Sequence, residues 1–265
     1  MKQHPRTLGQ VFLHDANIVQ KILRFANPLP GNRIIEIGCG KGILTRALAA
    51  VGPTTVIEID ARWIAYVTDL ELPGVTYLHA DATRVDYGQF PLGSPIIANI
   101  PYHITSPLLV AFAQYRNHLG PITIMIQKEM ATRLLAEPGT KAYGAMTLFC
   151  HYHFTVHNGF EVSRRCFWPV PSVDSQVITL QPKAAALSES DEALFFGMTR
   201  TFFWGRRKKM ITCLKNSPYI RLTSPLPDAC LAALNHRAES ASLSALLALF
   251  STLRHHMAFK EGCPL

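Results

Sequence analysis

Long apolar runs, paired cysteines and acidic side chains are all scarce in this chain of 265 residues. No window approaches the roughly 18 uninterrupted apolar residues of a membrane span. The first residues, MKQHPRTLGQVFLHD, lack the apolar core of a secretory signal. We therefore expect a cytoplasmic protein with no membrane partner. Hydrophobic residues make up 48% of the chain, and its length suggests one large domain with a smaller one, or two domains.

The cysteines are scattered, and no two of them form a C-x-x-C pair. This spacing predicts neither a zinc site nor a disulfide framework, so we expect reduced thiols and no metal. The histidines of HYHFTVH alternate on a segment that reads as a strand, but no neighbouring acid or cysteine supports metal binding there. The six cysteines are Cys39, Cys150, Cys166, Cys213, Cys230 and Cys263.

Acidic residues are outnumbered, since 18 Asp and Glu against 26 Lys and Arg leave a net charge of +8. A polyanion is the simplest partner for such a chain, with nucleic acid first and a membrane surface second. The cations concentrate in the segment 199–221, which contains no acid. A solvated helix face is the commoner reason for a short basic run. The candidate RNA contacts are Arg206, Arg207, Lys208 and Lys209.

Two of these cations are three residues apart, so on a helix Arg206 and Lys209 could share a face. We expect this pair to contact RNA. The alternative interpretation is that these side chains tie the C-terminal part of the chain to the rest.

Apolar runs alternate with helical patterns from about residue 33 to 137, which is typical of βαβ units and a parallel sheet. From AMTLFCHYHFTV to VDSQVITLQP the segments read as strands, which would extend the sheet with antiparallel strands. Beyond Pro182 the pattern is helical and without strand signals. The sequence predicts an α/β domain over residues 1–185 and a small all-helical domain over residues 186–265. The expected parallel strands are RIIEI, TTVIEI, VTYLH, PIIAN and ITIMIQ.

Glycines or acids follow the first three of these strands. The turn GCGKG, with Gly38 and Gly40, follows Glu36 and differs in spacing from the nicotinamide fingerprint G-x-G-x-x-G. Glu58 ends the second strand, where an acid can accept both hydroxyls of a ribose, and Asp81 follows the third. A turn glycine, a surface acid and a helix cap are the ordinary alternatives. Occurring in chain order, the three features together favour a ligand site at the carboxyl edge of the sheet.

The fourth strand ends in Asn99, Ile100, Pro101 and Tyr102. An exocyclic base amine is a poor nucleophile, so its alkylation needs acceptors that hold the N–H hydrogens. The Asn99 amide is one acceptor, and Pro101 restricts Ile100 to an extended backbone that can turn its carbonyl toward the same amine. Tyr102 can stack on the base, which is worth roughly 1–3 kcal/mol. The tetrapeptide therefore indicates amine methylation, with an ordinary strand-to-turn segment as the alternative.

In their order and spacing, several blocks of the chain resemble the rRNA adenine N6,N6-dimethyltransferases, and within that family the bacterial small-subunit type. The resemblance covers nearly the whole chain. The blocks are GQVFLHD, EIGCGKGILT, VIEID, the DA at Asp81, NIPYHITSPLL, IQKEMATRLL, KAYGAMT, FWPVPSVDS, RRK and LNHRAES.

This resemblance implies a class I S-adenosylmethionine-dependent methyltransferase fold, which is Rossmann-like. Gly38 and Gly40 would face the methionine part of the cofactor. Glu58 would face the ribose, and Asp81 the adenine amine. Asn99 would contact both cofactor and target. Phe167, which opens FWPVPSVDS, would cover the second face of a flipped adenine opposite Tyr102.

The chain departs from the family pattern at a few positions. Val11 stands where the family usually has Asn, so a side-chain contact to the cofactor is lost, while Leu13 and the local backbone still close the pocket. Cys39 replaces a common proline, and Ser172 a common lysine. Val11 bears on cofactor affinity more than on the class of reaction.

We expect a monomeric enzyme that places two methyl groups on each of two adjacent adenosines near the 3′ end of small-subunit rRNA, within an immature ribosomal particle. Direct transfer from sulfonium to nitrogen needs no metal. One alternative is a large-subunit methyltransferase of the antibiotic-resistance type, against which LNHRAES and the helical tail argue. The other is a non-catalytic RNA-binding or assembly factor, against which the intact Asn99, Pro101 and Tyr102 argue.

Overall fold

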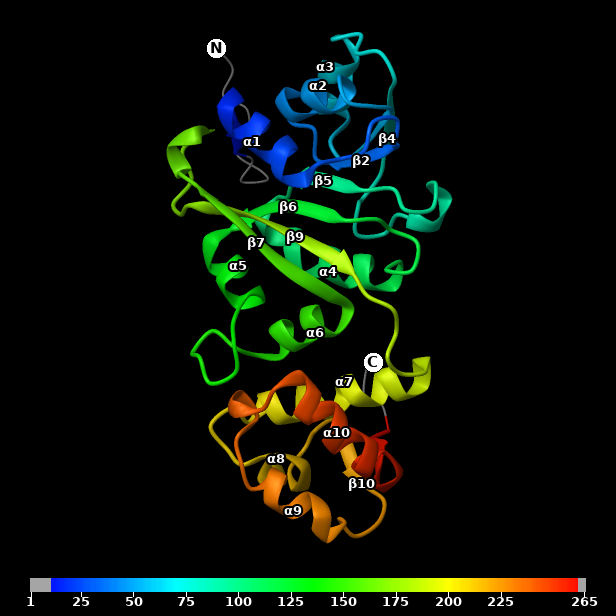
Figure 1. Ribbon diagram of the computed structural model, residues 1–265, viewed down its shortest axis with the longest axis vertical. Coiled ribbons are helices and arrows are strands. Elements are labelled where there is room, and N and C mark those ends of the chain that lie inside the picture. Colours follow the sequence, from blue (N-terminus) through cyan, green and yellow to red (C-terminus); the bar gives the residue numbers. More distant parts are fainter. Residues whose placement is uncertain (1–10, 262–265) are drawn as a thin grey trace. The chain divides into compact units, whose positions relative to one another are not determined.

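The computed structural model describes residues 11–261, which divide into two compact units (Figure 1). The first unit takes the chain up to Ala131 together with Phe154–Lys183, and the second takes Thr132–His153 and the chain from Ala184 on. This division differs from a boundary near residue 185, because residues 132–153 pack into the hydrophobic cluster of the second unit. The functions assigned to residues 1–185 and 186–265 stay predictions.

A seven-stranded sheet forms the first unit, in the order β4-β3-β2-β5-β6-β9-β7 (Figure 1). The five strands from β4 to β6 are parallel, and β9 and β7 extend them antiparallel, as the sequence predicts. A short β1 pairs antiparallel with β8 outside this sheet. The strands are β1 (Phe12–Leu13), β2 (Ile34–Ile37), β3 (Thr54–Glu58), β4 (Val75–His79), β5 (Ile96–Asn99), β6 (Ile122–Gln127), β7 (Phe154–Val162), β8 (Phe167–Trp168) and β9 (Ser175–Pro182).

One helix precedes the parallel strands and others follow them, and these helices bury apolar residues. The Asp15 carboxylate starts the first helix by accepting the N–H of Asn17 at 2.8 Å, and Asn27 ends it in a left-handed conformation. Val19 and Leu44, from the first two helices, pack in one hydrophobic cluster against the sheet. The helices are α1 (Ala16–Ala26), α2 (Ile43–Ala49), α3 (Ala61–Thr68), α4 (Thr105–Gln114) and α5 (Lys128–Leu134).

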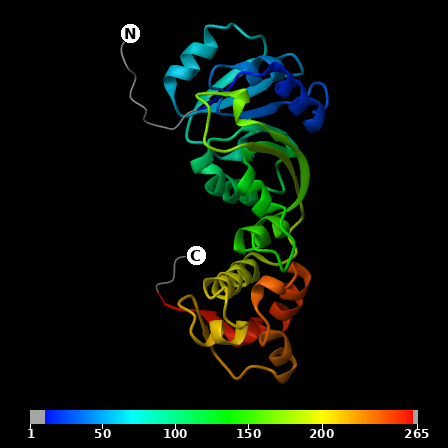
Figure 2. The same cartoon turned by 90° about the vertical axis from the view of Figure 1, so that its left-hand side faces the viewer.

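The second unit is mainly helical, but it is not all-helical as the sequence predicts. A two-stranded antiparallel sheet pairs Ile220 with Phe259 and Leu222 with Met257. Helices α7 and α10 pack side by side (Figures 1 and 2). The elements are α6 (Ala145–His153), α7 (Glu189–Trp204), α8 (Met210–Lys215), β10 (Ile220–Leu222), α9 (Asp228–Leu234), α10 (Leu243–Leu253) and β11 (Met257–Phe259).

The segment AMTLFCHYH, which the sequence predicts as strand, is the helix α6. Leu148 and Tyr152 of this helix are buried, and so is His153, which the sequence places on a strand. A short apolar run does not distinguish a buried strand from a buried helix by its period. The interpretation of residues 145–153 as strand is therefore wrong.

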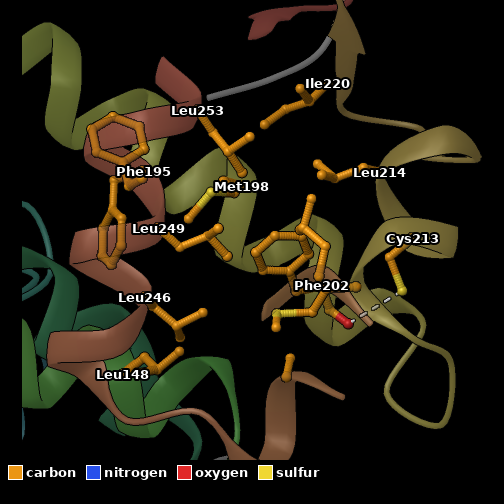
Figure 3. Packing of buried hydrophobic residues seen from close by; sticks show 14 of the residues in the cluster. Leu148, Phe195, Met198, Phe202, Cys213, Leu214, Ile220, Leu246, Leu249 and Leu253 are labelled. Atoms are coloured by element: carbon orange, nitrogen blue, oxygen red, sulfur yellow. Dashed lines mark hydrogen bonds between the residues drawn. The ribbon is translucent and has the colours of Figure 1, made fainter. Parts of the chain in front are cut away.

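Large side chains fill the core of the second unit (Figure 3). Phe195, Met198 and Phe202 of α7 are fully buried and meet Leu246 and Leu253 of α10. Within residues 11–261, no helix has the length and apolar character needed to cross a membrane.

Candidate active site

A cavity of about 800 Å³ lies at the carboxyl ends of β2, β3, β4 and β5. Gly38 follows β2, Glu58 ends β3, Asp81 follows β4 and Asn99 ends β5, and all four line this cavity. Carboxyl ends of parallel strands meet at one edge of a sheet, which is where open α/β sheets bind ligands. The structure therefore brings together the four positions that the sequence singles out in chain order.

The turn after β2 needs its glycines for two reasons, namely their backbone conformation and the room that a missing side chain leaves for a neighbouring ring. Gly38 and Gly40 have φ values of 77° and 48°, in the left-handed region that other residues rarely adopt. A Cβ on Gly40 would lie 2.9 Å from Cδ1 of Phe12, so the absent side chain admits this ring. A Cβ on Gly38 would meet nothing closer than the Asn99 carbonyl at 3.8 Å, and the turn is open to the cavity there.

Two carboxylates are held in place at the next two strands. Glu58 is 7% exposed, and its Oε1 accepts the Asp60 N–H at 2.9 Å while its Oε2 accepts the Cys39 thiol at 3.8 Å. Asp81 Oδ1 accepts both the N–H and the hydroxyl of Thr83, and these bonds lower the pKa of Asp81. Asp81 is therefore ionised at neutral pH.

Glu36, which precedes the glycine turn, is a third carboxyl group in the cavity wall. It is 1% exposed, and burial raises its pKa to about 8, to which the nearby Glu58 contributes. Its Oε2 accepts no hydrogen bond from residues 11–261. Glu36 is thus mainly protonated at neutral pH. Over the same residues, no cluster of three or more His, Cys, Asp and Glu side chains is arranged to hold a metal ion.

The four residues from Asn99 to Tyr102 form the wall of the cavity at β5. Asn99 is half-buried, whereas Ile100 is 2% exposed and its N–H donates to the Met125 carbonyl at 3.1 Å. The Tyr102 hydroxyl lies 2.8 Å from Ser175 Oγ, and burial raises the pKa of this phenol. The Tyr102 ring is therefore neutral and fixed at its far end.

Phe167 does not lie where the sequence predicts. It is 1% exposed, pairs with Leu13 across β1 and β8, and packs in the hydrophobic cluster instead of lining the cavity. Side chains alternate between the two faces of a strand, so the next residue, Trp168, faces outward and is 62% exposed. In this structure Phe167 is not placed to stack on a base. Val11 and Leu13 do line the cavity, whereas Gly9 and Gln10 of the same block lie outside the described residues.

The basic segment after α7 is split between bound and exposed cations. Arg206 donates through Nε to Glu239 at 3.2 Å and through its terminal nitrogen to the carbonyls of Thr140 and Lys141. Lys209 Nζ lies 3.5 Å from Asn235 Oδ1. The Arg206 guanidinium therefore holds residues 140–141 within the second unit, which favours a bracing role for this side chain, and the expectation that Arg206 and Lys209 share an RNA-contacting face stays a prediction.

The sequence interpretation misses several residues that line the cavity. Phe12 and Trp63 place their rings 4.7 Å apart, and the exposed Lys41 lies on the rim. No motif identifies Trp63, since aromatic residues in amphipathic helices usually serve packing. Phe12 could have been predicted as a cavity residue from its position between Val11 and Leu13, which the sequence already assigns to the pocket.

Comparison with known proteins agrees with this geometry. Residues 1–226 match the family described as Ribosomal RNA adenine dimethylase. Ribosomal RNA small subunit methyltransferase A of Chlorobium limicola is 36% identical over 255 residues, covering 95% of this chain and 94% of that protein.

Two solved structures resemble the chain over 92% of its length. A dimethyladenosine transferase from Plasmodium falciparum has a TM-score of 0.79 and 26% identity over 98% of that chain. The 23S rRNA methyltransferase ErmE has a TM-score of 0.70 and 25% identity over 99% of that chain. With the family match, the fold and the strand-end residues in agreement, this chain belongs to the ribosomal RNA adenine dimethylase family.

Proposed function

We propose that this protein transfers methyl groups from S-adenosylmethionine to the amino nitrogens of two adjacent adenosines near the 3′ end of small-subunit rRNA, two per adenosine. The observation that carries the proposal is the convergence of Gly38, Glu58, Asp81 and Asn99 on one cavity. The Chlorobium limicola relative is named for the small ribosomal subunit, which supports small-subunit rRNA as the substrate over large-subunit rRNA.

The residues present fit this cofactor. S-adenosylmethionine supplies an electrophilic methyl group when bound. Glu58 presents a carboxylate that can accept the ribose hydroxyls, and the ionised Asp81 can accept from the adenine amine. The open turn at Gly38 leaves room for the methionine part. The cavity volume of about 800 Å³ lies in the range of small-molecule sites.

The residues at the end of β5 act on the target amine. The Asn99 side-chain oxygen accepts an amine hydrogen and favours the charge that develops on nitrogen as the new bond forms. Ile100 and Pro101 shape the wall beside it, and the Tyr102 ring offers one stacking face to a base taken out of its helix. With Phe167 buried, Tyr102 is the aromatic residue of this set that can stack.

The second unit offers a basic surface for RNA. Arg207, Lys208 and Lys209 are exposed, and Trp204 beside them is 51% exposed. Lys208 Nζ lies 5.6 Å from the centre of the Trp204 ring, so a cation and a base-stacking ring are presented together. We place the protein in the cytoplasm as a monomer that acts on an immature ribosomal particle.

A methyl-transfer assay on three substrates in parallel tests the proposed function. Immature small subunits should gain two methyl groups on each of two adjacent adenosines, whereas large subunits and naked rRNA should gain few. The measurement is mass spectrometry of nuclease fragments after incubation with isotope-labelled cofactor. Preferential labelling of large-subunit RNA would instead support the antibiotic-resistance type, and no labelling of any substrate would support a non-catalytic assembly factor.

Alanine variants of Arg206 and Lys208 should separate stability from RNA binding. Arg206→Ala removes an ion pair and bonds to two carbonyls, so the free energy of unfolding should fall by about 1 kcal/mol, since the side chain is partly exposed. Lys208→Ala should leave stability unchanged and reduce the slope of log RNA affinity against log salt by about 0.7–0.9. Urea unfolding and salt-dependent RNA binding are the two measurements. A reversed pattern would show that Arg206, not Lys208, is the phosphate contact.

A further inference from the structure

We infer that Lys41 binds the carboxylate at the amino-acid end of the cofactor, an inference that rests on the proposed function. Lys41 lies in the glycine turn between β2 and α2 and lines the cavity rim. Of the described residues that line the cavity, it is the one lysine or arginine.

The strand order, combined with the cofactor contacts proposed above, decides which end of the cofactor meets Lys41. Neighbouring strands run β4, β3, β2, β5 across the sheet, so Asp81, Glu58, Gly38 and Asn99 follow each other along its edge. With the adenine at Asp81, the ribose at Glu58 and the methyl group near Asn99, the amino-acid end lies over the turn after β2. Lys41 is three residues beyond Gly38 in that turn.

Two aromatic rings hold the Lys41 ammonium. Its Nζ lies 5.4 Å from the centre of the Phe12 ring and 5.1 Å from that of Trp168. Phe12 lines the same cavity and fills the space that Gly40 leaves. A cation over ring faces is attracted without being neutralised, so the ammonium is positioned and keeps its full charge. Within residues 11–261, no carboxylate forms an ion pair with Lys41.

The charges of the cavity point to the same assignment. Its wall holds the carboxylates of Glu58 and Asp81, which suit hydroxyls, amines and the sulfonium, beside the mainly protonated Glu36. An amino-acid carboxylate brought among them would meet acidic neighbours, unless it is directed to a cation. Lys41 offers that cation at the rim, where the carboxylate can keep part of its hydration.

Calorimetry with two ligands tests this inference directly. S-adenosylhomocysteine contains the amino-acid end, and 5′-methylthioadenosine has the same adenosine and thioether but no amino acid. Lys41→Ala should weaken binding of S-adenosylhomocysteine roughly tenfold, the factor for one charge-assisted contact at a partly exposed site. Binding of 5′-methylthioadenosine should not change. Lys41→Arg should restore most of the affinity for S-adenosylhomocysteine.

Lys21→Ala is a matched control. Lys21 Nζ lies 4.0 Å from the centre of the Phe160 ring, in the first unit but away from the cavity wall. This variant loses a lysine over an aromatic ring without touching the cavity, so it should bind both ligands as the wild type does. Thermal melting of each variant verifies that the fold is kept.

The outcomes separate this inference from the proposed function. If wild-type protein binds neither ligand, the proposed function fails. If the wild type binds both and Lys41→Ala leaves them unchanged, or weakens both equally, Lys41 does not select the carboxylate and the inference alone is wrong. If Lys41→Ala weakens only RNA binding, Lys41 contacts a phosphate, which also overturns the inference.

Discussion

Replacing Asn99 by alanine should lower the rate of methyl transfer by about 10²–10³, the loss typical of one preorganised polar group acting on a developing charge. Asn99 ends β5, lines the cavity and is half-buried, so its amide is held where little water can replace it. The single-turnover rate at saturating cofactor isolates the chemical step. Affinity for the ribosomal particle should stay nearly constant, because the RNA contacts that we propose, at Arg207, Lys208 and Lys209, lie in the other unit.

Asn32→Ala is the control for this variant, because Asn32 is exposed in the loop before β2 and does not line the cavity. It should transfer methyl groups at the wild-type rate. A near-normal single-turnover rate for Asn99→Ala would remove the amide from the mechanism. A large loss of particle binding would mean that Asn99 acts by holding RNA.

Glu36 should make the wild-type protein less stable as the pH rises from about 4.5 to about 8. In the unfolded chain this carboxyl loses its proton near its ordinary pKa of 4.5, whereas the folded protein keeps the proton up to about 8. The folded state therefore binds more protons over this interval, and the free energy of unfolding falls with rising pH. The total loss above pH 8 is on the order of 5 kcal/mol, at 1.36 kcal/mol for each unit of pKa shift.

Glu36→Gln isolates this contribution, because glutamine has nearly the same shape and does not titrate. The variant should gain stability relative to wild type between pH 5 and pH 9, as measured by urea unfolding at each pH. Glu71→Gln is the control, because Glu71 is exposed. Its free energy of unfolding should change with pH in the same way as that of the wild type. If the free energy of unfolding of Glu36→Gln has the same pH dependence as that of the wild type, Glu36 is ionised in the folded protein and has a partner there.

The parallel part of the sheet and its ligand edge could be predicted because both depend on local signals. Strands buried on both faces, such as β2 and β3, read as continuous apolar runs. Once those strands are parallel, Glu58 and Asp81 must come to one edge. The roles at Asn99 and Tyr102 came from the chemistry of their side chains and from the family resemblance, and the structure places both residues in the cavity wall.

The errors lie where tertiary packing decides. The apolar segment of α6 suits a strand or a helix, and its burial in the second unit selects the helix. Strands β10 and β11 have three residues each, too few to display a period. Phe167 was assigned to the ligand because its block matches the family, yet the pairing of β8 with β1 turns its ring into the core. Phe167 and Trp168 are neighbours on one strand and therefore point to opposite faces. The motif does not indicate which of the two faces the core.

The two units are interleaved along the chain, which matters for the order in which the protein is made. During synthesis, residues 132–153 emerge before β7 and β9, the strands that complete the sheet of the first unit. This segment can complete its packing only after the chain from Ala184 on has been made, because Leu148 and Tyr152 share a core with that part. A fragment that stops at residue 185 therefore holds a finished sheet and an unpaired apolar helix. Neither unit can be expressed as one continuous piece of the gene, and a separate RNA-recognition fragment has to include both segments of the second unit.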